Sequence, residues 1–305
     1  MQVLERLGSL GRDAFLFDIA DLPDAATLTI DYRDPADPCA RLTHATAGTV
    51  DLSAASAVWW RRPQLVNLQA VTDDDARGFT HGEWHEALYG VWALLKCPWM
   101  NSPVQDEIAS RKALQLAVAS RLGFRVPDTL MTSDAGEARA FIERHGVGRT
   151  IYKIFSATHR VWRETRLVQA EDLSMLDAVR VAPVIFQEYI PAVADLRITV
   201  VGRDLYPMAI DTRGTAYEVD FRVSLQEAVV TTVDLPEAVV GAIHRLMAHF
   251  GLVYGAVDMR ISEKGEYYFL EVNTAGEFLF AEHRSGLPLT DAVAGWLANP
   301  QPSAG

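Results

Sequence analysis

The chain has 305 residues, 49% hydrophobic and 22% charged, an ordinary composition for a globular protein with enough apolar side chains to fill a core. Its length allows two or three subdomains. The formal net charge of −12 argues against broad binding to nucleic acid or to anionic membranes, although a local basic cleft for phosphates is compatible with it.

No apolar stretch in the sequence approaches the roughly 20 residues that a membrane span requires. The first residues, Met-Gln-Val-Leu-Glu-Arg, lack the apolar core of a signal peptide. Cys39 and Cys97 are the only cysteines and have no metal-type spacing, so we expect reduced and partly buried thiols. These observations predict a cytoplasmic protein that binds neither membranes nor nucleic acid.

The first hundred residues predict a small α/β unit, in which short strand candidates alternate with turns rich in Asp and Pro. Adjacent strand residues point to opposite faces, so Trp59 and Trp60 cannot both pack into one layer. Packing in a core is the simplest interpretation of these rings, whereas Arg61 or Arg62 could reach a substrate or phosphates. The strand candidates are residues 14–19, 27–32 and 57–60.

A helical pattern follows Asn101-Ser102-Pro103 and runs over residues 104–122, where Gly123 closes it. It carries Lys112, which taken alone is a solvated helix charge. Helix and strand patterns then alternate along the chain. In order, they are a short strand after Val126 and Pro127, a helix at 135–145 and strands at 150–155 and 184–190.

The C-terminal third predicts a hairpin followed by a helix. Gly202-Arg203-Asp204 is a turn candidate between strands at residues 196–201 and 205–210. Asp234 and Glu237 then form a capping-box-like start to an amphipathic helix. Gly251 ends this helix.

The last two strand candidates, residues 255–261 and 267–273, carry two carboxylates and an amide. If the chain folds back at the polar turn between them, Asp258 faces Glu271, and Asn273 lies two residues farther on the same side. Directly opposed like charges destabilise a sheet, so this pair suggests a bound cation or a nearby basic group. Oxygen ligands of this kind suit Mg²⁺. The side chains expected to face the other way are Val257, Met259, Leu270 and Val272.

Further residues could bind an anion, and each also has a simpler interpretation. Lys153 lies on an apolar strand face, where it needs an anionic partner or must extend to the sheet edge. Asp195 and Arg197 share one strand face and could simply pair with each other. Alternatively, the planar guanidinium of Arg197 matches the oxygens of a transferring phosphoryl group. The run Gln187-Glu188-Tyr189-Ile190 before Pro191 is either a plain edge strand or a segment whose backbone meets a ligand.

These residues together form an ordered pattern over residues 101–283 that resembles the ATP-grasp ligases. In that family, two α+β subdomains hold ATP between them. The pattern consists of Lys112, Lys153, Gln187-Glu188-Tyr189-Ile190, Asp195-Leu196-Arg197, Asp258 and Glu271-Val272-Asn273.

The resemblance implies a role for each member of the pattern. Lys112 and Lys153 would contact the nucleotide phosphates, and Lys153 and Arg197 would offset charge that develops during phosphoryl transfer. Asp258, Glu271 and Asn273 would hold Mg²⁺. Gln187, Glu188, Tyr189 and Ile190 would bind adenine or position the ribose, and Asp195 is a further residue of the nucleotide site.

The N-terminal region resembles one particular group of ATP-grasp enzymes. Residues 16–23, 58–63 and 99–103 resemble the pre-ATP-grasp region of the microviridin-type graspetide synthetases, which modify ribosomal peptides, and Trp59-Trp60-Arg61-Arg62-Pro63 is the most family-specific string. Residues 252–258 and 269–278 continue the likeness. It therefore spans nearly the whole chain.

This resemblance implies an ATP-grasp fold of the α+β and α/β type. We expect a pre-grasp domain at residues 1–100, an N-terminal and central grasp subdomain at 101–186, a C-terminal subdomain at 187–298 and a flexible tail at 299–305. The implied enzyme is an ATP- and Mg²⁺-dependent carboxylate ligase. It would form an acyl phosphate and close ω-ester or ω-amide linkages in a ribosomal precursor peptide, and homodimers are a further expectation.

Two other functions fit the same motifs. One is an intermolecular carboxylate–amine ligase of the glutamate-adding type, and the other is an ATP-binding regulatory module without turnover. The presence of both Lys residues and all three metal-type ligands argues against the second. Residues 155–166 lack the strongly Gly-rich phosphate loop of many ATP-grasp proteins, but their small side chains and Arg residues could still approach phosphates.

Overall fold

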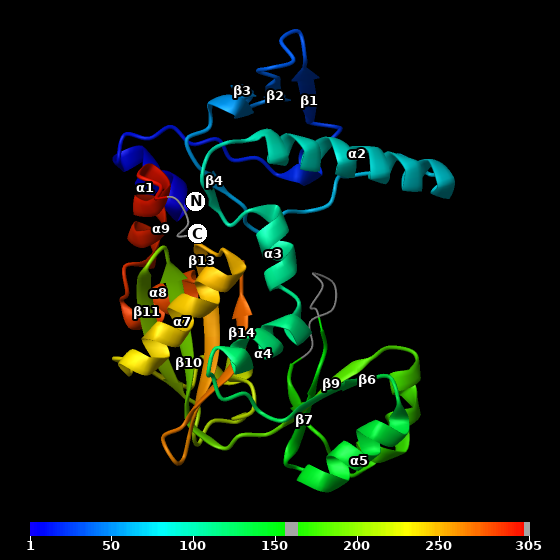
Figure 1. The fold of residues 1–305 in the computed structure, drawn as a ribbon, viewed down its shortest axis with the longest axis vertical. Coiled ribbons are helices and arrows are strands. Elements are labelled where there is room, and N and C mark those ends of the chain that lie inside the picture. Colours follow the sequence, from blue (N-terminus) through cyan, green and yellow to red (C-terminus); the bar gives the residue numbers. More distant parts are fainter. Residues whose placement is uncertain (156–163, 302–305) are drawn as a thin grey trace. The chain divides into compact units, whose positions relative to one another are not determined.

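The computed structural model of the chain describes residues 1–155 and 164–301 (Figure 1). The chain divides into two compact units. The first comprises Met1–Asp106, Gly251–Val253 and the residues from Thr290 onward, and the second comprises Glu107–Phe250 and Tyr254–Leu289.

The first unit is built on a three-stranded antiparallel sheet, in the order β1-β2-β3, and on a short parallel pair, β4 with β5. Its strands are β1 (Ala26–Asp31), β2 (Cys39–His44), β3 (Gly48–Asp51), β4 (Val58–Trp59) and β5 (Trp99–Met100). Its helices are α1 (Gln2–Ser9), η1 (Ile19–Asp21), η2 (Leu52–Ala54), α2 (Asp74–Leu94) and most of α9 (Leu289–Ala298). The strands predicted at residues 27–32 and 57–60 are confirmed as β1 and β4, the second of them shorter.

The strand predicted at residues 14–19 is wrong, because residues 12–18 pair with no strand in the part of the chain that the structure describes. The side chain of Asp18 accepts a hydrogen bond of 3.0 Å from the Ala20 N–H and so begins the helical turn η1. Ile19 and Leu22 pack into a small core with Leu88. The apolar residues at the end of the predicted strand therefore lead into a helical turn, where Ile19 is buried.

Trp59 and Trp60 have different neighbours, as the alternation of a strand predicts. Trp60 meets Trp92 and Trp99 edge-on, with ring centroids 5.9 Å and 6.4 Å away. The Arg61 guanidinium lies 5.3 Å from the centre of the Trp59 ring. Trp60 therefore packs within the first unit.

The second unit contains a four-stranded antiparallel sheet in the order β6-β9-β7-β8. Helix α5 (Ala135–His145) and η3 (Glu171–Arg180) pack against this sheet around the buried Phe141, Ile142 and Phe186. Helix α5 has the bounds that the sequence predicts, because the Asp134 side chain caps its first N–H groups. The strands are β6 (Thr129–Thr132), β7 (Thr150–Lys153), β8 (Arg166–Leu167) and β9 (Val184–Glu188).

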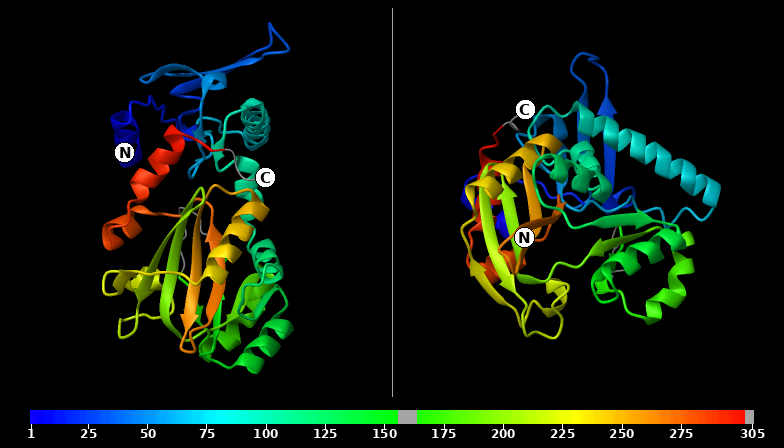
Figure 2. Two further views of the ribbon diagram at one scale, coloured as in Figure 1. Left: turned by 60° about the vertical axis from the view of Figure 1, so that its left-hand side comes forward. Right: turned by 60° about the horizontal axis from the view of Figure 1, so that its bottom comes forward.

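A five-stranded antiparallel sheet completes the second unit, in the order β12-β11-β10-β13-β14. Helix α7 (Glu237–Phe250) runs along it (Figure 2) and buries an apolar face that includes Ile243 and Leu246. Both predicted hairpins and the helix between them are confirmed. The strands are β10 (Ala192–Val201), β11 (Asp204–Asp211), β12 (Val229–Thr232), β13 (Tyr254–Ser262) and β14 (Tyr267–Asn273). The shorter helices of this unit are α6 (Phe221–Ser224) and α8 (Leu279–Ser285).

The single helix predicted at residues 104–122 is two helices, α3 (Pro103–Ala109) and α4 (Lys112–Arg121). The amide of Gln115 explains the break. Its Nε2 donates to the Ala109 carbonyl at 2.5 Å and to the Val272 carbonyl at 2.8 Å, and its Oε1 accepts from the Val272 N–H at 3.0 Å. The contact of Gln115 with Val272 on β14 thus interrupts the helix that the local sequence favours, and Lys112 lies at the start of α4.

No helix within residues 1–155 and 164–301 is both long and apolar enough to cross a membrane. Cys39 and Cys97 are free and half-buried, as predicted.

Candidate active site

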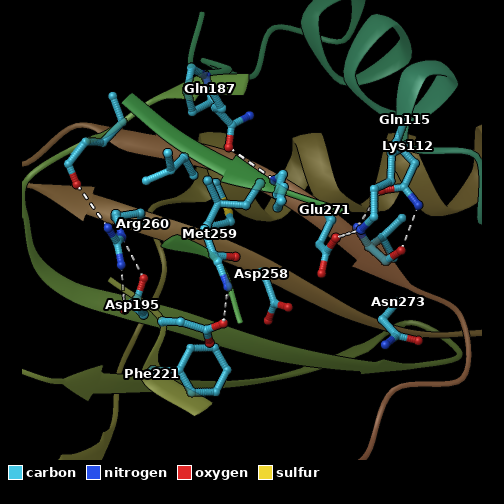
Figure 3. A pocket seen from close by; sticks show the side chains of 18 of the residues that line it. Lys112, Gln115, Gln187, Asp195, Phe221, Asp258, Met259, Arg260, Glu271 and Asn273 are labelled. Atoms are coloured by element: carbon cyan, nitrogen blue, oxygen red, sulfur yellow. Dashed lines mark hydrogen bonds and ion pairs between the residues drawn. The ribbon is translucent and has the colours of Figure 1, made fainter. Parts of the chain in front are cut away.

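The second unit contains a cavity of about 550 Å³ that is lined by charged side chains from both of its sheets. Figure 3 shows its centre, where Asp258 on β13 and Glu271 on β14 lie on the same face of the five-stranded sheet. The two residues are directly opposed in the hairpin register, as predicted. The cavity also receives side chains from the start of α4, from β7, from the end of β9 and from α6.

A β-bulge between Asp258 and Met259 changes one expectation for the hairpin. Met259 pairs with Phe269 instead of Leu270, so Leu270 is the extra residue of β14. Phe269 is fully buried, whereas Leu270 lines the cavity. The prediction that Leu270 faces away from Glu271 is therefore wrong, and Leu270 adds an apolar surface to a cavity rich in charge.

Arg197 is the neighbour of Asp258 across β10 and β13. Its Nη1 lies 2.9 Å from each carboxylate oxygen of Asp258, and its Nη2 donates to the Glu277 carbonyl at 3.1 Å. The simple alternative, in which Arg197 pairs with Asp195, is wrong. Burial dominates at Asp258 and raises the pKa of its carboxyl, although the Arg197 charge opposes this shift.

Lys112 Nζ forms an ion pair with Glu271. Burial alone would raise the pKa of Glu271, but the charges of Lys112 and Lys153 outweigh it and lower the pKa to about 2. Gln115 holds this end of α4 against β14. Sequence reasoning missed Gln115, because a buried amide in a helical pattern carries no signal of its own.

Lys153 extends from β7 into the cavity, where its Nζ donates to Oε1 of Gln187 at 3.1 Å. This partner is neutral, whereas the strand pattern led us to expect an anion. Burial lowers the pKa of Lys153 to about 8, and the charge of Glu271 partly opposes that shift. Gln187 is itself held by Thr129, whose Oγ1 accepts from its Nε2 at 2.8 Å.

Residues 188–190, which connect the two sheets, line the cavity. The N–H groups of Glu188 and Tyr189 are already used, since they donate to the carbonyls of Asp128 and Arg149. Within residues 1–155 and 164–301, the N–H of Ile190 has no hydrogen-bond acceptor. Ile190 therefore offers a backbone donor at this end of the cavity.

Arg222 and Arg260 also line the cavity, and sequence reasoning singled out neither. The guanidinium of Arg222 on α6 is held by Asp220, with Nε 2.8 Å from Oδ1 and Nη2 2.5 Å from Oδ2. Asp220 also accepts from the Thr165 N–H at 3.1 Å. Arg260 on β13 pairs with Asp195, so both oxygens of Asp195 already have a partner (Figure 3).

Asn273 lies at the end of β14, where its Oδ1 accepts from the Ala275 N–H at 3.0 Å. It follows Glu271 by two residues and lines the same cavity. Among the described residues, no group of three or more His, Cys, Asp or Glu side chains gathers as in a metal site. The expected Mg²⁺ ligands are two carboxylates and one carboxamide. The stretch at 156–163, expected to approach phosphates, lies outside the described residues.

Two family profiles match the chain. One, described as an MvdD pre-ATP grasp domain, matches residues 1–107, and the other, described as a RimK-like ATP-grasp domain, matches residues 109–297. The arrangement of helices and sheets is the ATP-grasp fold. Because the second profile covers more than half of its length, the chain belongs to the RimK-like ATP-grasp family of ligases.

Solved structures show the same fold. The macrocyclase MdnC from Microcystis aeruginosa MRC, bound with the precursor peptide MdnA, is 28% identical with a TM-score of 0.85, covering 98% of this chain and 95% of that one. A RiPP-associated ATP-grasp ligase of Chryseobacterium gregarium, in complex with ADP and a leader and core peptide, is 26% identical with a TM-score of 0.87, covering 99% and 93%. The macrocyclase MdnB from Microcystis aeruginosa MRC is 28% identical with a TM-score of 0.82, covering 97% and 94%. No curated protein matches the chain.

Proposed function

We propose that the chain uses ATP to activate a side-chain carboxylate of a ribosomal precursor peptide and closes an ω-ester or ω-amide linkage within that peptide. The observation that carries this proposal is the likeness to macrocyclases over nearly the full length of both chains. One of them was solved with a precursor peptide bound. The charged side chains that line the cavity of the second unit would bind and activate the reacting groups.

The proposed reaction has two steps. A carboxylate oxygen of an Asp or Glu side chain attacks the γ-phosphorus of ATP, so that ADP leaves and an acyl phosphate forms. A hydroxyl of Ser or Thr, or an amine of Lys, then attacks the acyl carbon. Phosphate leaves with the oxygen that it received, and the nucleophile releases its proton. No nucleophile of the enzyme is required.

Positive charge is the main contribution of the chain to these steps. Lys153 is suited to a phosphate because it extends into the cavity and its hydrogen-bond partner, Gln187, is neutral. Arg222 adds a second cation at the same cavity. Catalysis of phosphoryl transfer comes mostly from such positioning and electrostatic stabilisation. Lys112 and Arg197 form ion pairs with Glu271 and Asp258, the two carboxylates of the site.

The residues present also fit Mg²⁺. Asp258 and Glu271 oppose each other directly and pair with Arg197 and Lys112, so their fit to Mg²⁺ rests on the type of their donor atoms. Their oxygens, with the carboxamide of Asn273, form the all-oxygen donor set that Mg²⁺ prefers. When bound there, the ion would offset charge on the phosphate oxygens. We therefore assign the Mg²⁺ site to Asp258, Glu271 and Asn273.

The base of the nucleotide belongs at the segment of residues 187–190. The N–H of Ile190, which has no acceptor in the described part of the chain, is a donor for a ring nitrogen of adenine, and Leu270, Ile151 and Ile190 provide apolar contact around it. Glu188 and Tyr189 complete this end of the site. Asp195 acts here only indirectly, since Arg260 occupies both of its oxygens.

Mass spectrometry tests the proposal. The purified chain is incubated with ATP, Mg²⁺ and a short acidic peptide encoded beside its gene that contains Ser, Thr or Lys. The peptide is expected to lose the mass of one water for each linkage. A gain in mass would instead indicate the glutamate-adding alternative, and ADP release without any change in peptide mass would contradict macrocyclisation. Sedimentation of the same sample measures whether the chain forms the expected homodimer.

A further inference from the structure

Arg260 makes more hydrogen bonds than its ion pair requires. Arg260 and Asp195 are buried, with 6% and 4% of their surfaces exposed. The Nε and Nη2 of Arg260 donate to the two oxygens of Asp195 at 2.7 Å and 3.0 Å. This bidentate pair fixes the plane of the guanidinium.

The rest of the guanidinium binds backbone carbonyls from two separate segments. Its Nη1 donates to the Ile190 carbonyl at 3.2 Å, directly after β9. Its Nη2 lies 3.3 Å and 3.2 Å from the carbonyls of Glu218 and Val219, in the segment before α6. The Tyr189 ring lies 5.4 Å from the guanidinium.

These contacts bracket one peptide group. Arg260 touches the Tyr189 ring on one side of the Tyr189–Ile190 peptide and the Ile190 carbonyl on the other. Among the described residues the N–H of that peptide has no acceptor, and Ile190 lines the base end of the cavity. A buried ion pair is weak evidence for stability, because apolar side chains often replace such a pair without loss. The carbonyl contacts point to a more specific role than stability.

We propose that Arg260, held in place by Asp195, is a positioning residue that directs the Ile190 N–H toward the base of the bound nucleotide. This proposal rests on the nucleotide site of the proposed function. Lysine could neutralise Asp195 but has no planar fork for the two oxygens and the carbonyls together. The part of the cavity proposed for the phosphates is held by other residues, since Asp220 and Tyr217 both hydrogen-bond the backbone of Thr165.

The test compares ADP with tripolyphosphate, which has no base, by calorimetric titration of the full chain. The double variant Asp195→Leu with Arg260→Met removes both charges together and is expected to fold, with a lower melting temperature because the carbonyls that Arg260 binds lose a donor. Its affinity for ADP should fall about tenfold, the effect of one misdirected hydrogen bond. Its affinity for tripolyphosphate should not change. The single variant Arg260→Lys, which leaves Asp195 paired, should show the same selective loss.

The control is Asp31→Leu with Arg33→Met, a pair on the first unit that does not line the cavity and should leave both affinities unchanged. Wild-type ADP affinity in Arg260→Lys, or in a folded double variant, would overturn the positioning role and leave the proposed function standing. Equal losses for ADP and tripolyphosphate would assign Arg260 a general structural role and also overturn the proposal. A wild-type chain that binds neither ligand would overturn both proposals.

Discussion

Glu271 interacts with three of the charged residues of the cavity. Lys112 pairs with it, Asp258 opposes it and Lys153 acts on it electrostatically. The variant Glu271→Gln keeps the shape of the side chain but removes its charge. We expect turnover to fall about 100-fold, the effect of losing a metal-site interaction, while the melting temperature shows that the fold persists.

The matched control is Glu266→Gln on the same hairpin, whose carboxylate pairs with Arg125 and does not line the cavity. Its turnover is expected to match the wild type. Steady-state ADP release measures both variants, and an active Glu271→Gln enzyme would remove the assignment of Glu271 to the Mg²⁺ site.

Lys153 predicts a pH dependence of nucleotide binding. Burial lowers its pKa to about 8 in the free protein, so the side chain loses its charge as the pH rises through this value. A bound phosphate favours the charged form, and the affinity for ADP should therefore fall as the pH rises above 8. Titration calorimetry between neutral and alkaline pH measures this decrease. The variant Lys153→Arg stays charged and should show little decrease, whereas a flat profile in the wild type would contradict this role.

The pKa of Lys153 has the opposite effect on the stability of the fold, which it increases as the pH rises. Between a pKa of about 8 in the folded chain and the usual lysine pKa of 10.5 in the unfolded chain, the unfolded chain holds more protons on Lys153. Its contribution to the free energy of unfolding therefore rises with pH in this window. A weaker affinity at alkaline pH is thus not expected to come from loss of the fold through Lys153.

At the scale of elements, local patterns predicted much of the second unit. The hairpin of β13 and β14 could be predicted because its strands alternate and its turn contains Gly265, which has a φ of +76°. The opposition of Asp258 and Glu271 follows from that register. The bulge that exposes Leu270 to the cavity could not be predicted, because nothing in the alternation marks which residue is the extra one.

Contacts between elements explain the other differences. The break between α3 and α4 depends on Gln115 meeting Val272, a residue far along the chain. The partnership of Arg260 with Asp195 depends on the register between β10 and β13. Residue types at single positions suggest charges that need partners, but only the packing of strands decides which partner each charge receives.

Gly276, after β14, lets the backbone pass closely over Arg197. A Cβ at this position would lie 2.5 Å from the Ala256 Cβ and 2.8 Å from Nη2 of Arg197. The variant Gly276→Ala must therefore displace Arg197 or the strand. We expect a loss of about 1–3 kcal/mol in the free energy of unfolding, typical of overpacking, and a lower turnover.

The matched control is Gly295→Ala in α9, where no described atom outside the adjacent residues and the nearby helix backbone lies within 4 Å of the added Cβ. Because alanine favours a helix, this variant should gain about 0.5–1 kcal/mol. Denaturant unfolding measures both variants, and equal stabilities would show that the backbone tolerates the Cβ at Gly276.

At the scale of the whole molecule, a net charge of −12 coexists with a cavity lined by five Lys or Arg residues and five Asp or Glu residues. Basic charge is thus concentrated locally beside acidic metal-type ligands, which fits a protein that binds a polyphosphate at one site and not nucleic acid over a broad surface. The likeness to macrocyclases extends across both units, so the peptide-modifying function is proposed for the full chain and not for its second unit alone.

The transfer of oxygen from peptide to phosphate tests the central claim most directly. The precursor peptide is prepared with oxygen-18 in its side-chain carboxylates and incubated with the chain, ATP and Mg²⁺. The account predicts one labelled oxygen in inorganic phosphate for every linkage closed, with ADP as the other product. Unlabelled phosphate, or label recovered in AMP, would contradict activation of the carboxylate through an acyl phosphate.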